Sequence, residues 1–465
     1  MHKLTAQPVD VDVSLDEAVR AVSLQPLSAI LESTDTRTNQ GRFTILCCQP
    51  VEVIDCPPDG PDPFEQMREA LRRTQLTPPG DCELPSHLPF FGGWVGFFSY
   101  EAGRFIERLP ATTNRDLPIP LARFALYESA LIHDAKDSQW WEVRSPQSNP
   151  TNWLKEPRAS ARADQTRLKL PSPSTNLTPD IYLNRVRRAK RYIEAGDIFQ
   201  VNLTRRESFP ITEPASTIYD RLRRANPAAY AAYLAWTNPA GDPIAILSAS
   251  PELFLKVDGQ EVRTRPIKGT RPRSADPIVD AARIADLAVS DKDRAELAMI
   301  VDLERNDLGR VCEYGSVRVE TADTQATPYR IETHPTVHHL VADVTGRLRP
   351  ECDVIDLLRA TFPGGSITGA PNVRAIQIID ELETTERVVY TGAIGYFSLD
   401  GHASFNIAIR TMTITAGHAH IGTGGGIVAD SDPEEEFEET QVKIAGLRTA
   451  LGVGDPSHRE VPHPK

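Results

Sequence analysis

Cysteine and clustered basic residues are scarce in this sequence of 465 residues. Its six cysteines are scattered and form no Cys-x-x-Cys pair, which excludes the common zinc motifs and a disulfide scaffold and is typical of a reducing cytoplasm. Lysine and arginine number 51 against 64 acidic residues, and no long basic run is present. Because nucleic-acid affinity rests on clustered lysine and arginine, we predict no nucleic-acid partner.

Long hydrophobic runs are also absent. The N-terminal residues turn acidic within the first ten or so positions and contain no apolar segment, so we expect no signal peptide. The uncharged stretch at residues 226–241 is short and broken by Pro227 and Pro239, which excludes a transmembrane helix. These features predict a cytoplasmic protein with no membrane partner.

The P-loop motif and the dinucleotide fingerprint do not occur, although two glycine-rich segments do. Residues 362–371 (FPGGSITGAP) precede a predicted helix, and residues 422–426 (GTGGG) precede a strongly acidic segment. Both can present backbone N–H groups to an anion, because glycine leaves the backbone accessible. Together with Arg410 and with two glutamates from separate predicted helices, Glu296 and Glu439, these segments favour a small substrate that carries more than one carboxylate.

A change of composition divides the chain. Residues 146–178 are rich in Ser, Pro, Asn and Thr, which predicts a linker or surface loop between an N-terminal region (1–145) and a catalytic domain (179–452). We predict helices over 179–195, 291–307 and 371–382 and after Pro433, and strands over 42–46, 123–133, 197–203, 244–247, 392–398 and 403–413. The elements do not alternate regularly, so an α+β fold with a mixed, largely antiparallel core and outer helices is expected.

Two of the predicted helices carry carboxylates that need an explanation. Glu296, Ile300 and Leu303 share one helical stripe, so a carboxylate stands on an otherwise apolar face and requires a metal, a cation or a proton. A salt bridge to an arginine of the same segment is the alternative. In the last helix the dipole explains the acidic first turn but not the deeper Glu438 and Glu439. One inward glutamate from each helix would suit Mg²⁺.

Eight segments carry a recognisable pattern. They are AGDIFQVNL, SASPELFL, PIKGTRPR, DRAELAMIVDLERNDLGR, FPGGSITGAP, GAIGY, FNIAIRT and DPEEEFEET, in this order within residues 180–450. Together they closely resemble the chorismate-utilising enzymes, a family of anthranilate, aminodeoxychorismate, isochorismate and salicylate synthases. The first 145 residues, through PFFGGWVGFFSYE, resemble the N-terminal region of the two amine-forming synthases. The resemblance implies two facing mixed or antiparallel β-sheets surrounded by helices, with the site between the sheets.

The resemblance also implies a metal and an acid. Glu296 and Glu439 resemble the ligands of the Mg²⁺ that holds the ring carboxylate of chorismate, and Glu436 is a neighbouring helper. Glu252 resembles the acid that assists departure of the C4 hydroxyl group. His339 lies at a family active-site histidine, although an isolated histidine is more often structural.

The resemblance also implies which residues hold the substrate. Arg410, Tyr390 and the amide of Gly426 resemble the residues that hold the enolpyruvyl carboxylate, and Thr270 and Gln200 are the further candidates for substrate contact. Chorismate brings two carboxylates to a pocket that already holds three glutamates. Because unopposed like charges are costly, the metal, Arg410 and a lysine are required as counter-charges.

Two positions indicate which reaction of the family to expect. Gln200 stands where isochorismate and salicylate synthases carry a water-activating lysine, and an amide cannot act as that base. Lys268 stands where anthranilate synthases usually carry alanine and where aminodeoxychorismate synthases carry a lysine that attacks C2 of the ring. The resemblance therefore implies amination at C4 to 4-amino-4-deoxychorismate, for 4-aminobenzoate and folate synthesis. If Lys268 is only a counter-charge, anthranilate formation remains the alternative.

Ammonia and regulation complete the expectations. No cysteine lies in a glutaminase nucleophile motif, which implies a separate glutamine amidotransferase subunit as ammonia donor. Leu31–Ser33 matches part of the tryptophan pocket of feedback-regulated relatives, but Ala229 replaces a usual proline in NPAAY, which argues against tryptophan binding. A catalytically silent tryptophan-sensing subunit is the remote alternative, and the intact Glu252, Glu296 and Glu439 argue against it.

Overall fold

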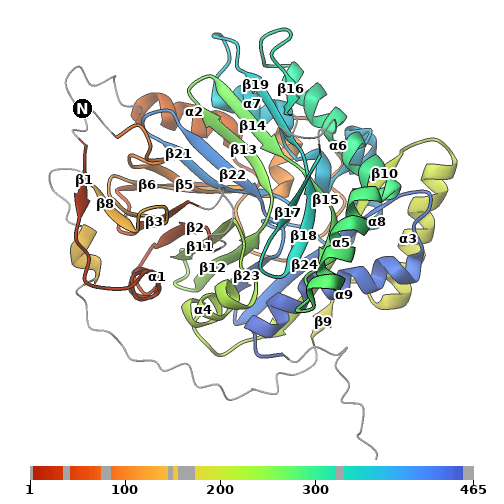
Figure 1. Ribbon diagram of the computed structural model, residues 1–465, viewed down its shortest axis with the longest axis horizontal. Helices are drawn as coiled ribbons and strands as arrows, with labels where there is room; N and C mark the ends of the chain where they lie inside the picture. The colour runs from red at the N-terminus through yellow and green to blue at the C-terminus, as the bar shows by residue number, and fades with distance from the viewer. Residues whose placement is uncertain are drawn as a thin grey trace, which may run out of the picture.

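The computed structural model describes residues 4–34, 42–74, 85–144, 150–154, 173–320 and 329–453. Antiparallel sheets form the interior of this part of the chain, and helices cover them from outside (Figure 1). Across these ranges, no helix combines the length and the apolar character that a membrane crossing requires.

The larger sheet has twelve strands. In spatial order these are β1 (Thr5–Val9), β8 (Gln139–Arg144), β7 (Ala130–Asp134), β3 (Phe43–Cys47), β2 (Ala29–Glu32), β11 (Tyr230–Thr237), β12 (Pro243–Ser250), β23 (Thr411–Thr415), β24 (His418–Ile427), β10 (Gln200–Pro210) and β20 (Gly369–Ala370), and β9 (Ser174–Thr175) also pairs with β10. Strand β2 pairs directly with β11, so both sides of the predicted division at 146–178 contribute to one sheet. Residues 146–149 and 155–172 of the predicted linker lie outside the described residues, and the domain boundaries stay a prediction.

The second sheet has nine strands and the third has three. The nine-stranded order is β16 (Arg318–Glu320), β19 (Asp343–Arg347), β14 (Glu261–Arg265), β13 (Leu253–Asp258), β22 (Ala403–Ile407), β21 (Ala393–Ser398), β5 (Gly93–Phe98), β6 (Ala122–Tyr127) and β4 (Glu52–Cys56); the small sheet is β15 (Ile267–Pro272), β18 (Val337–Val341) and β17 (Arg330–Thr333). One apolar core joins side chains of the two large sheets, among them Ile45, Phe97 and Ile394. The predicted α+β fold with two facing sheets is therefore confirmed, and the small third sheet is an addition to it.

The helices surround these sheets. They are α1 (Leu15–Ser23), α2 (Pro63–Thr74), α3 (Pro179–Glu194), α4 (Ala215–Ala225), α5 (Pro277–Val289), α6 (Asp291–Gly309), α7 (Val354–Thr361), α8 (Asn372–Leu382) and α9 (Pro433–Ala450), with short 3₁₀ turns η1 (Tyr100–Phe105), η2 (Pro150–Leu154) and η3 (Gly365–Ile367). The helices predicted at 179–195, 291–307, 371–382 and after Pro433 correspond to α3, α6, α8 and α9. Thr178 precedes α3 as expected, but its side chain makes no capping hydrogen bond.

Two of the predicted strands are wrong, because each corresponds to two strands in the structure. The run 123–133 is β6 and β7, and the run 403–413 contains β22 and the start of β23, and in each case the two strands belong to different sheets. Strands β6 and β23 are buried on both faces, and the polar positions of β23 are buried like its apolar ones, so the polarity of the sequence does not mark where the chain leaves one sheet for the other. The chain thus crosses between the facing sheets at both places.

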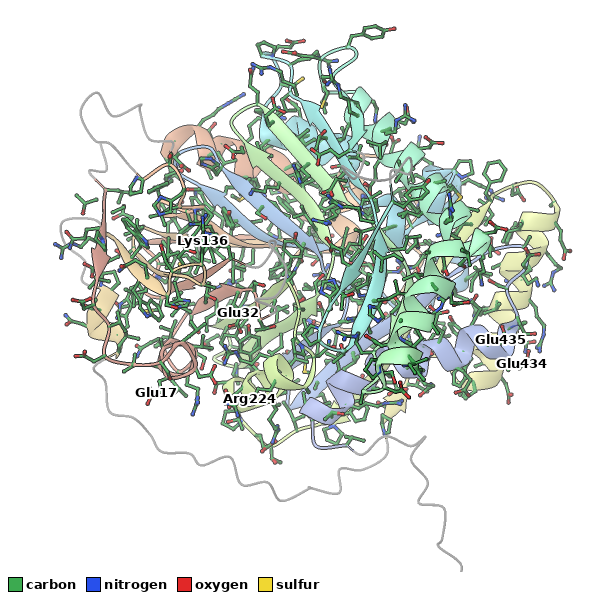
Figure 2. All side chains as sticks on the ribbon, in the orientation of Figure 1. Glu17, Glu32, Lys136, Arg224, Glu434 and Glu435 are labelled. Atoms are coloured by element: carbon green, nitrogen blue, oxygen red, sulfur yellow. The ribbon has the colours of Figure 1, made fainter. Side chains whose placement is uncertain are left out.

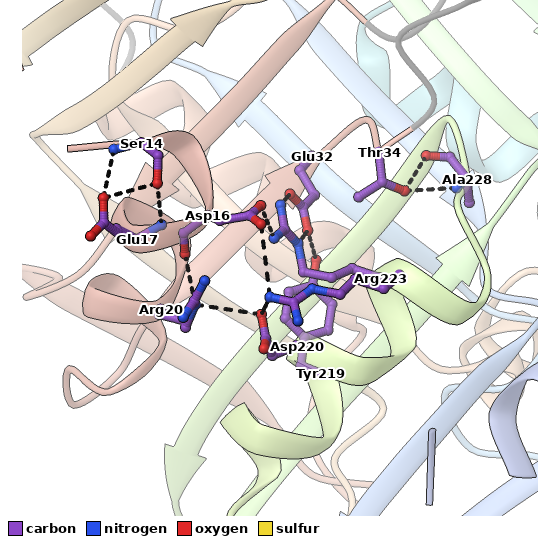
Figure 3. A network of polar contacts seen from close by, with 11 residues as sticks. Ser14, Asp16, Glu17, Arg20, Glu32, Thr34, Tyr219, Asp220, Arg223 and Ala228 are labelled. Carbon is purple, nitrogen blue, oxygen red and sulfur yellow. Dashed lines mark hydrogen bonds and ion pairs between the residues drawn. The ribbon is translucent and has the colours of Figure 1, made fainter. Parts of the chain in front are cut away.

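A buried ion pair fixes β2 to helix α4 (Figure 3). The Arg223 guanidinium donates to both carboxylate oxygens of Glu32, at 2.9 and 2.8 Å, and the Tyr219 hydroxyl donates to the same carboxylate at 2.7 Å. Arg223 also reaches Asp16 at the start of α1, which is half-exposed. These contacts join the N-terminal region to the rest of the chain.

We expect Glu32→Ala to lower the free energy of unfolding by about 3–5 kcal/mol, because it removes the buried partner of the buried Arg223 charge and leaves only the half-exposed Asp16. Asp16→Ala, which removes a half-exposed partner of the same arginine, is the control and should cost at most about 1 kcal/mol. Denaturant unfolding of both variants measures the difference. Equal and small losses would contradict a structural role for the buried pair.

Candidate active site

Glu252 and Arg410 lie where the chain passes from one large sheet to the other. Glu252 stands between β12 and β13, and Arg410 stands between β22 and β23. The two crossings are bonded to each other: the Ala249 N–H donates to the Arg410 carbonyl at 3.0 Å, and the Ser250 hydroxyl donates to the Ile407 carbonyl at 2.6 Å. Residues more than 150 positions apart in the sequence thereby become neighbours.

The electrostatics of this pair suit an acid and an anion receptor. Burial raises the pKa of Glu252, although a hydrogen bond from Ser366 and the charges of Lys268 and Arg410 oppose the rise. Arg410 adopts a left-handed backbone, with φ of 49°, and its guanidinium makes no hydrogen bond or ion pair with any residue that the structure describes. A charged group without a protein partner in a half-buried position is suited to receive a carboxylate.

A β-bulge sets the direction of the Lys268 side chain. The pairing of β15 with β18 shifts register between Lys268 and Thr270, and Gly269 between them has φ of 71°. A Cβ at Gly269 would stand 2.8 Å from Leu287 and 2.9 Å from Asp293, so only glycine fits. The Lys268 Nζ is directed toward the Ser366 carbonyl, 3.5 Å away. Since Ser366 also contacts Glu252, Lys268 and Glu252 face the same glycine-rich loop.

Thr270 and His339 are partners across the same pair of strands. The Thr270 Oγ1 and the His339 Nδ1 are 2.9 Å apart, and the His339 ring also packs edge-on against that of His334. Burial, aided by the charge of Arg410, lowers the pKa of His339 well below its usual value. His339 is therefore an uncharged imidazole near neutral pH, fixed beside the bulge that carries Lys268.

The glycine run of β24 lets other side chains approach the backbone. A Cβ at Gly422 would lie 2.3 Å from the Tyr390 ring, and one at Gly426 would lie 2.8 Å from the Gln200 amide nitrogen. Gln200 is fully buried, and neither atom of its amide has a hydrogen-bond partner among the described residues. Leaving such atoms unsatisfied costs about 1–3 kcal/mol each, so this amide has hydrogen-bonding capacity left for a ligand or a water molecule.

The three predicted metal-site glutamates come from α6 and α9. Glu296 is half-buried and makes no hydrogen bond or ion pair with any described residue, so the alternative of a salt bridge to an arginine of its own segment is wrong. Glu439 pairs with Lys443 at 2.7 Å, and Glu436 accepts a hydrogen bond from Ser431 at 2.6 Å.

The charges of these glutamates interact. Burial raises the pKa of Glu296; Lys268 opposes the rise and Glu439 adds to it. Burial also acts on Glu439, but the charge and hydrogen bond of Lys443 outweigh it and lower its pKa. Glu296 and Glu439 thus lie within electrostatic reach of each other and of Lys268. In the described ranges, however, no three His, Cys, Asp or Glu side chains gather closely enough to hold a metal ion.

The acidic residues in the first turn of α9 lie at the helix N-terminus, where the helix dipole favours negative charge. Asp432 caps the helix by accepting from the N–H groups of Glu434 and Glu435, at 3.0 and 3.1 Å. Glu434 and Glu435 lie at the outer surface (Figure 2), and Glu434 pairs with Arg187 at 2.8 Å. Only the next residue, Glu436, is buried behind Gly425.

Glu304 is a further carboxyl group, half-buried, that the sequence reasoning missed. It lies eight positions after Glu296 and four after Ile300 on α6, at the edge of the same stripe, and accepts a hydrogen bond from the Thr264 hydroxyl at 3.0 Å. Burial first, and then the charge of Glu252, raise its pKa well above the usual range. Because Glu304 follows Ile300 by one turn, its place beside the Glu296 stripe is the sequence signal that could have found it.

A separate open cavity of about 980 Å³ lies between the large sheets, lined by Leu31–Ser33, Ala229–Ala231 and Ile394–Tyr396 among others. The two segments named for a tryptophan pocket therefore do meet. The Glu32 carboxylate is already held by Arg223 and Tyr219. We expect from Ala229 that tryptophan does not bind there, and this stays a prediction.

Comparison with known proteins places this geometry in a family. A model of chorismate binding enzymes matches residues 29–449. Aminodeoxychorismate synthase component 1 of Klebsiella aerogenes is 39% identical over 91% of this chain and 93% of its own length, and anthranilate synthase component 1 of Streptomyces coelicolor is 37% identical over 91% and 83%. The crystal structure of anthranilate synthase component I from Streptococcus pneumoniae superposes with a TM-score of 0.74 at 31% identity, over 89% of this chain and 93% of that one. This chain belongs to the family of chorismate-binding enzymes.

Proposed function

We propose that this chain is the chorismate-aminating component of an aminodeoxychorismate synthase, which forms 4-amino-4-deoxychorismate from chorismate and ammonia. The observation that carries the proposal is the position of Lys268. Its charge acts on Glu252, Glu296 and Glu439, so it lies among the groups proposed to hold and activate the substrate. The similarity to the synthase of Klebsiella aerogenes is in keeping with this choice.

The proposed chemistry assigns one step to each group. The Lys268 amine forms a bond to C2 of the ring while the C4–O bond breaks, and Glu252 transfers its proton to the departing oxygen so that water leaves. Ammonia then forms a bond at C4, and the Lys268 amine departs from C2 with its electron pair. Arg410, Tyr390 and the Gly426 amide hold the enolpyruvyl carboxylate throughout.

Thr270, His339 and Gln200 complete the proposed site. Thr270 and the uncharged His339 keep the bulge at Lys268 in place and contact the ring side of the substrate. Gln200 offers a buried amide to the substrate, and it cannot deprotonate water. An incoming neutral ammonia needs no such base, which favours amination over hydration.

The donors present fit a Mg²⁺ ion. This ion takes one or two protein carboxylates and completes its shell with water and substrate oxygens, and the carboxylate of Glu296 has no protein partner among the described residues. Glu296 and Glu439 would hold it, with Glu436 behind them. When bound, the ion supplies positive charge to the ring carboxylate. Lys443, which now pairs with Glu439, would remain its neighbour.

Glu296→Gln is expected to raise the Mg²⁺ concentration for half-maximal activity by about 10–100-fold, because the amide keeps the shape but loses the charge. The exposed Glu438→Gln, one position before Glu439, is the matched control and should leave it unchanged. Calorimetric titration of Mg²⁺ with chorismate present gives a readout that does not need turnover. Unaltered Mg²⁺ binding in Glu296→Gln would remove this residue from the metal site.

Ammonia is proposed to come from a separate glutamine amidotransferase subunit. The catalytic elements span most of the chain, and the described cysteines are all buried or half-buried without a nucleophile motif around them. Free ammonium salt should therefore replace glutamine in the isolated protein.

One assay tests the proposal. The protein is incubated with chorismate, Mg²⁺ and ammonium salt, and the products are separated with and without an added 4-amino-4-deoxychorismate lyase. We expect 4-aminobenzoate only when the lyase is present. Fluorescent anthranilate without the lyase would assign the chain to anthranilate synthases instead. No turnover together with tryptophan binding would favour a silent sensing subunit.

A further inference from the structure

Glu383 and Arg387, which lie between α8 and β21, form a buried ion pair. The two residues are only 6% and 5% exposed. The Arg387 Nε donates to the Glu383 Oε2 at 2.9 Å, and its Nη2 donates to the Oε1 at 2.6 Å, so the contact is bidentate. Because both charges lose their hydration, a buried ion pair adds little stability over apolar side chains of the same volume. What such a pair does supply is a fixed geometry.

The Arg387 guanidinium uses all five of its N–H donors. Two of them reach Glu383. The Nη1 donates to the Ile367 carbonyl at 3.0 Å and to the Thr391 hydroxyl at 3.3 Å. The second Nη2 donor reaches the Asn202 carbonyl at 2.7 Å. Since the donors of a guanidinium have fixed directions in one plane, they hold these acceptors in fixed relative positions.

The bond to Ile367 reaches the glycine-rich turn η3. Ile367 follows Ser366, whose side chain makes a hydrogen bond with Glu252. The Ser366 carbonyl is the group toward which the Lys268 Nζ is directed, at 3.5 Å. Arg387 thus holds the turn that contacts both the proposed acid and the proposed nucleophile.

The bonds to Thr391 and Asn202 reach segments that carry proposed substrate contacts. Thr391 follows Tyr390, and its hydroxyl, which accepts from Arg387, donates to the Tyr390 carbonyl at 2.6 Å. Thr391 has a left-handed backbone with φ of 62°, which is unfavourable for a β-branched residue and needs support from its surroundings. Asn202 lies two positions after Gln200 on β10, so this bond holds the strand that carries the Gln200 amide.

Further contacts keep the ion pair itself in place. The Glu383 Oε1 also accepts from the N–H and the hydroxyl of Thr204 on β10, at 2.9 and 2.8 Å. From η1, the Tyr100 ring centroid lies 4.5 Å from the guanidinium carbon, and the Glu101 carboxylate accepts from the Arg387 N–H at 2.8 Å. The position of the guanidinium is therefore determined by groups on several elements.

We propose that Arg387 is a positioning residue of the chorismate site, which fixes η3 relative to the turn at Tyr390 and to β10. It acts through Ser366, Tyr390 and Gln200. This inference rests on the roles that the proposed function gives to these three residues. It requires only that they serve chorismate binding, so it does not depend on which amine is formed.

Arg387→Lys keeps the positive charge but replaces five donors in a rigid plane by three on one nitrogen. We expect it to lower kcat/KM for chorismate by about 10²-fold in the folded protein, through a higher KM and a lower kcat. The reason is that a displacement of about 1 Å at reacting groups has an effect of this size. Calorimetric titration of chorismate in the presence of Mg²⁺ should show a Kd that rises with KM.

Thr391→Val tests one of the three links alone. It keeps the β-branched shape but removes the hydroxyl between Arg387 and Tyr390, and it leaves the bond to Ile367 intact. We expect KM and Kd for chorismate to rise by about tenfold, the effect of about one hydrogen bond, with kcat within about twofold of wild type. Thr391→Ser keeps the hydroxyl and should restore both. This variant pair serves if Arg387→Lys does not fold.

A general loss of stability is excluded by a matched control. Asp134→Ala breaks another ion pair with a buried carboxylate, to Arg42 at 2.6 Å, on β7 near the opposite end of the sheet from β10. It should lower the thermal transition and leave kcat, KM and Kd unchanged. Wild-type Kd and KM in both Arg387→Lys and Thr391→Val would overturn the proposal.

The binding measurement also separates this proposal from the proposed function. The Kd for chorismate is measured without ammonia and does not depend on the product. If the wild-type protein forms anthranilate while Arg387→Lys and Thr391→Val still bind chorismate more weakly, the proposed function is wrong and the positioning role of Arg387 is supported.

Discussion

Replacement of Lys268 by alanine is expected to lower kcat for ammonia-dependent amination by about 10²-fold or more and to abolish any covalent adduct with the ring. The change removes the amine that the bulge at Gly269 aims toward Ser366. Chorismate should still bind, because Arg410, Tyr390 and the glutamates remain. Product formation and intact-protein mass spectrometry in the presence of chorismate measure the two effects.

Lys268→Arg decides between the two roles left open for this residue. Arginine keeps the positive charge but remains protonated and cannot attack C2. If Lys268 is a nucleophile, Lys268→Arg should be as inactive as Lys268→Ala. If it is only a counter-charge, arginine should restore much of the activity. Lys256→Ala, an exposed lysine on β13, is the control and should behave as wild type.

Glu252→Gln is expected to reduce kcat by about 10²–10⁴-fold with little change in KM, because the amide keeps the shape of the side chain but cannot transfer the proton. The burial that raises the pKa of Glu252 keeps the acid protonated at pH values where an exposed glutamate is ionised. Activity due to this acid is present below its raised pKa and is lost as the pH rises through it.

The residual activity of Glu252→Gln should therefore not decrease at alkaline pH, as the activity of the wild-type protein does. The control is Glu261→Gln, an exposed glutamate on the neighbouring strand β14, which should retain wild-type turnover and the wild-type profile. Nearly full activity in Glu252→Gln would show that the C4 hydroxyl departs without this proton. Folding of each variant is checked by its thermal transition.

The helices that carry the glutamates proposed for the metal site can be predicted from the sequence. Helices α6 and α9 have capping residues, Ser290 and Asp432, and helical spacing, and both were expected. The carboxylate that interrupts apolar positions marks the stripe through Glu296. Glu304 is not marked in this way, because it lies among charged neighbours in the sequence.

Other features could not be predicted because no local signal encodes them. The crossings at Glu252 and Arg410 follow β12 and β22, which are buried over most of their length up to the crossing, so nothing in the strands themselves marks where the chain changes sheets. The bulge at Gly269 becomes visible only when β15 is aligned with β18, 69 positions further along. The amide of Gln200 is buried and without a described partner because β20 and β24 both pair with β10, which no local signal in the sequence predicts.

The sequence by itself determined the family, the α+β class and the residue types that the site requires, because spaced motifs and helical stripes are local properties of the chain. The tertiary structure decided which of these residues are neighbours. It placed Lys268 among the glutamates and left Arg410 and Glu296 without described protein partners. Burial and the proximity of charges set the protonation of such groups, and both arise only when distant strands are brought together.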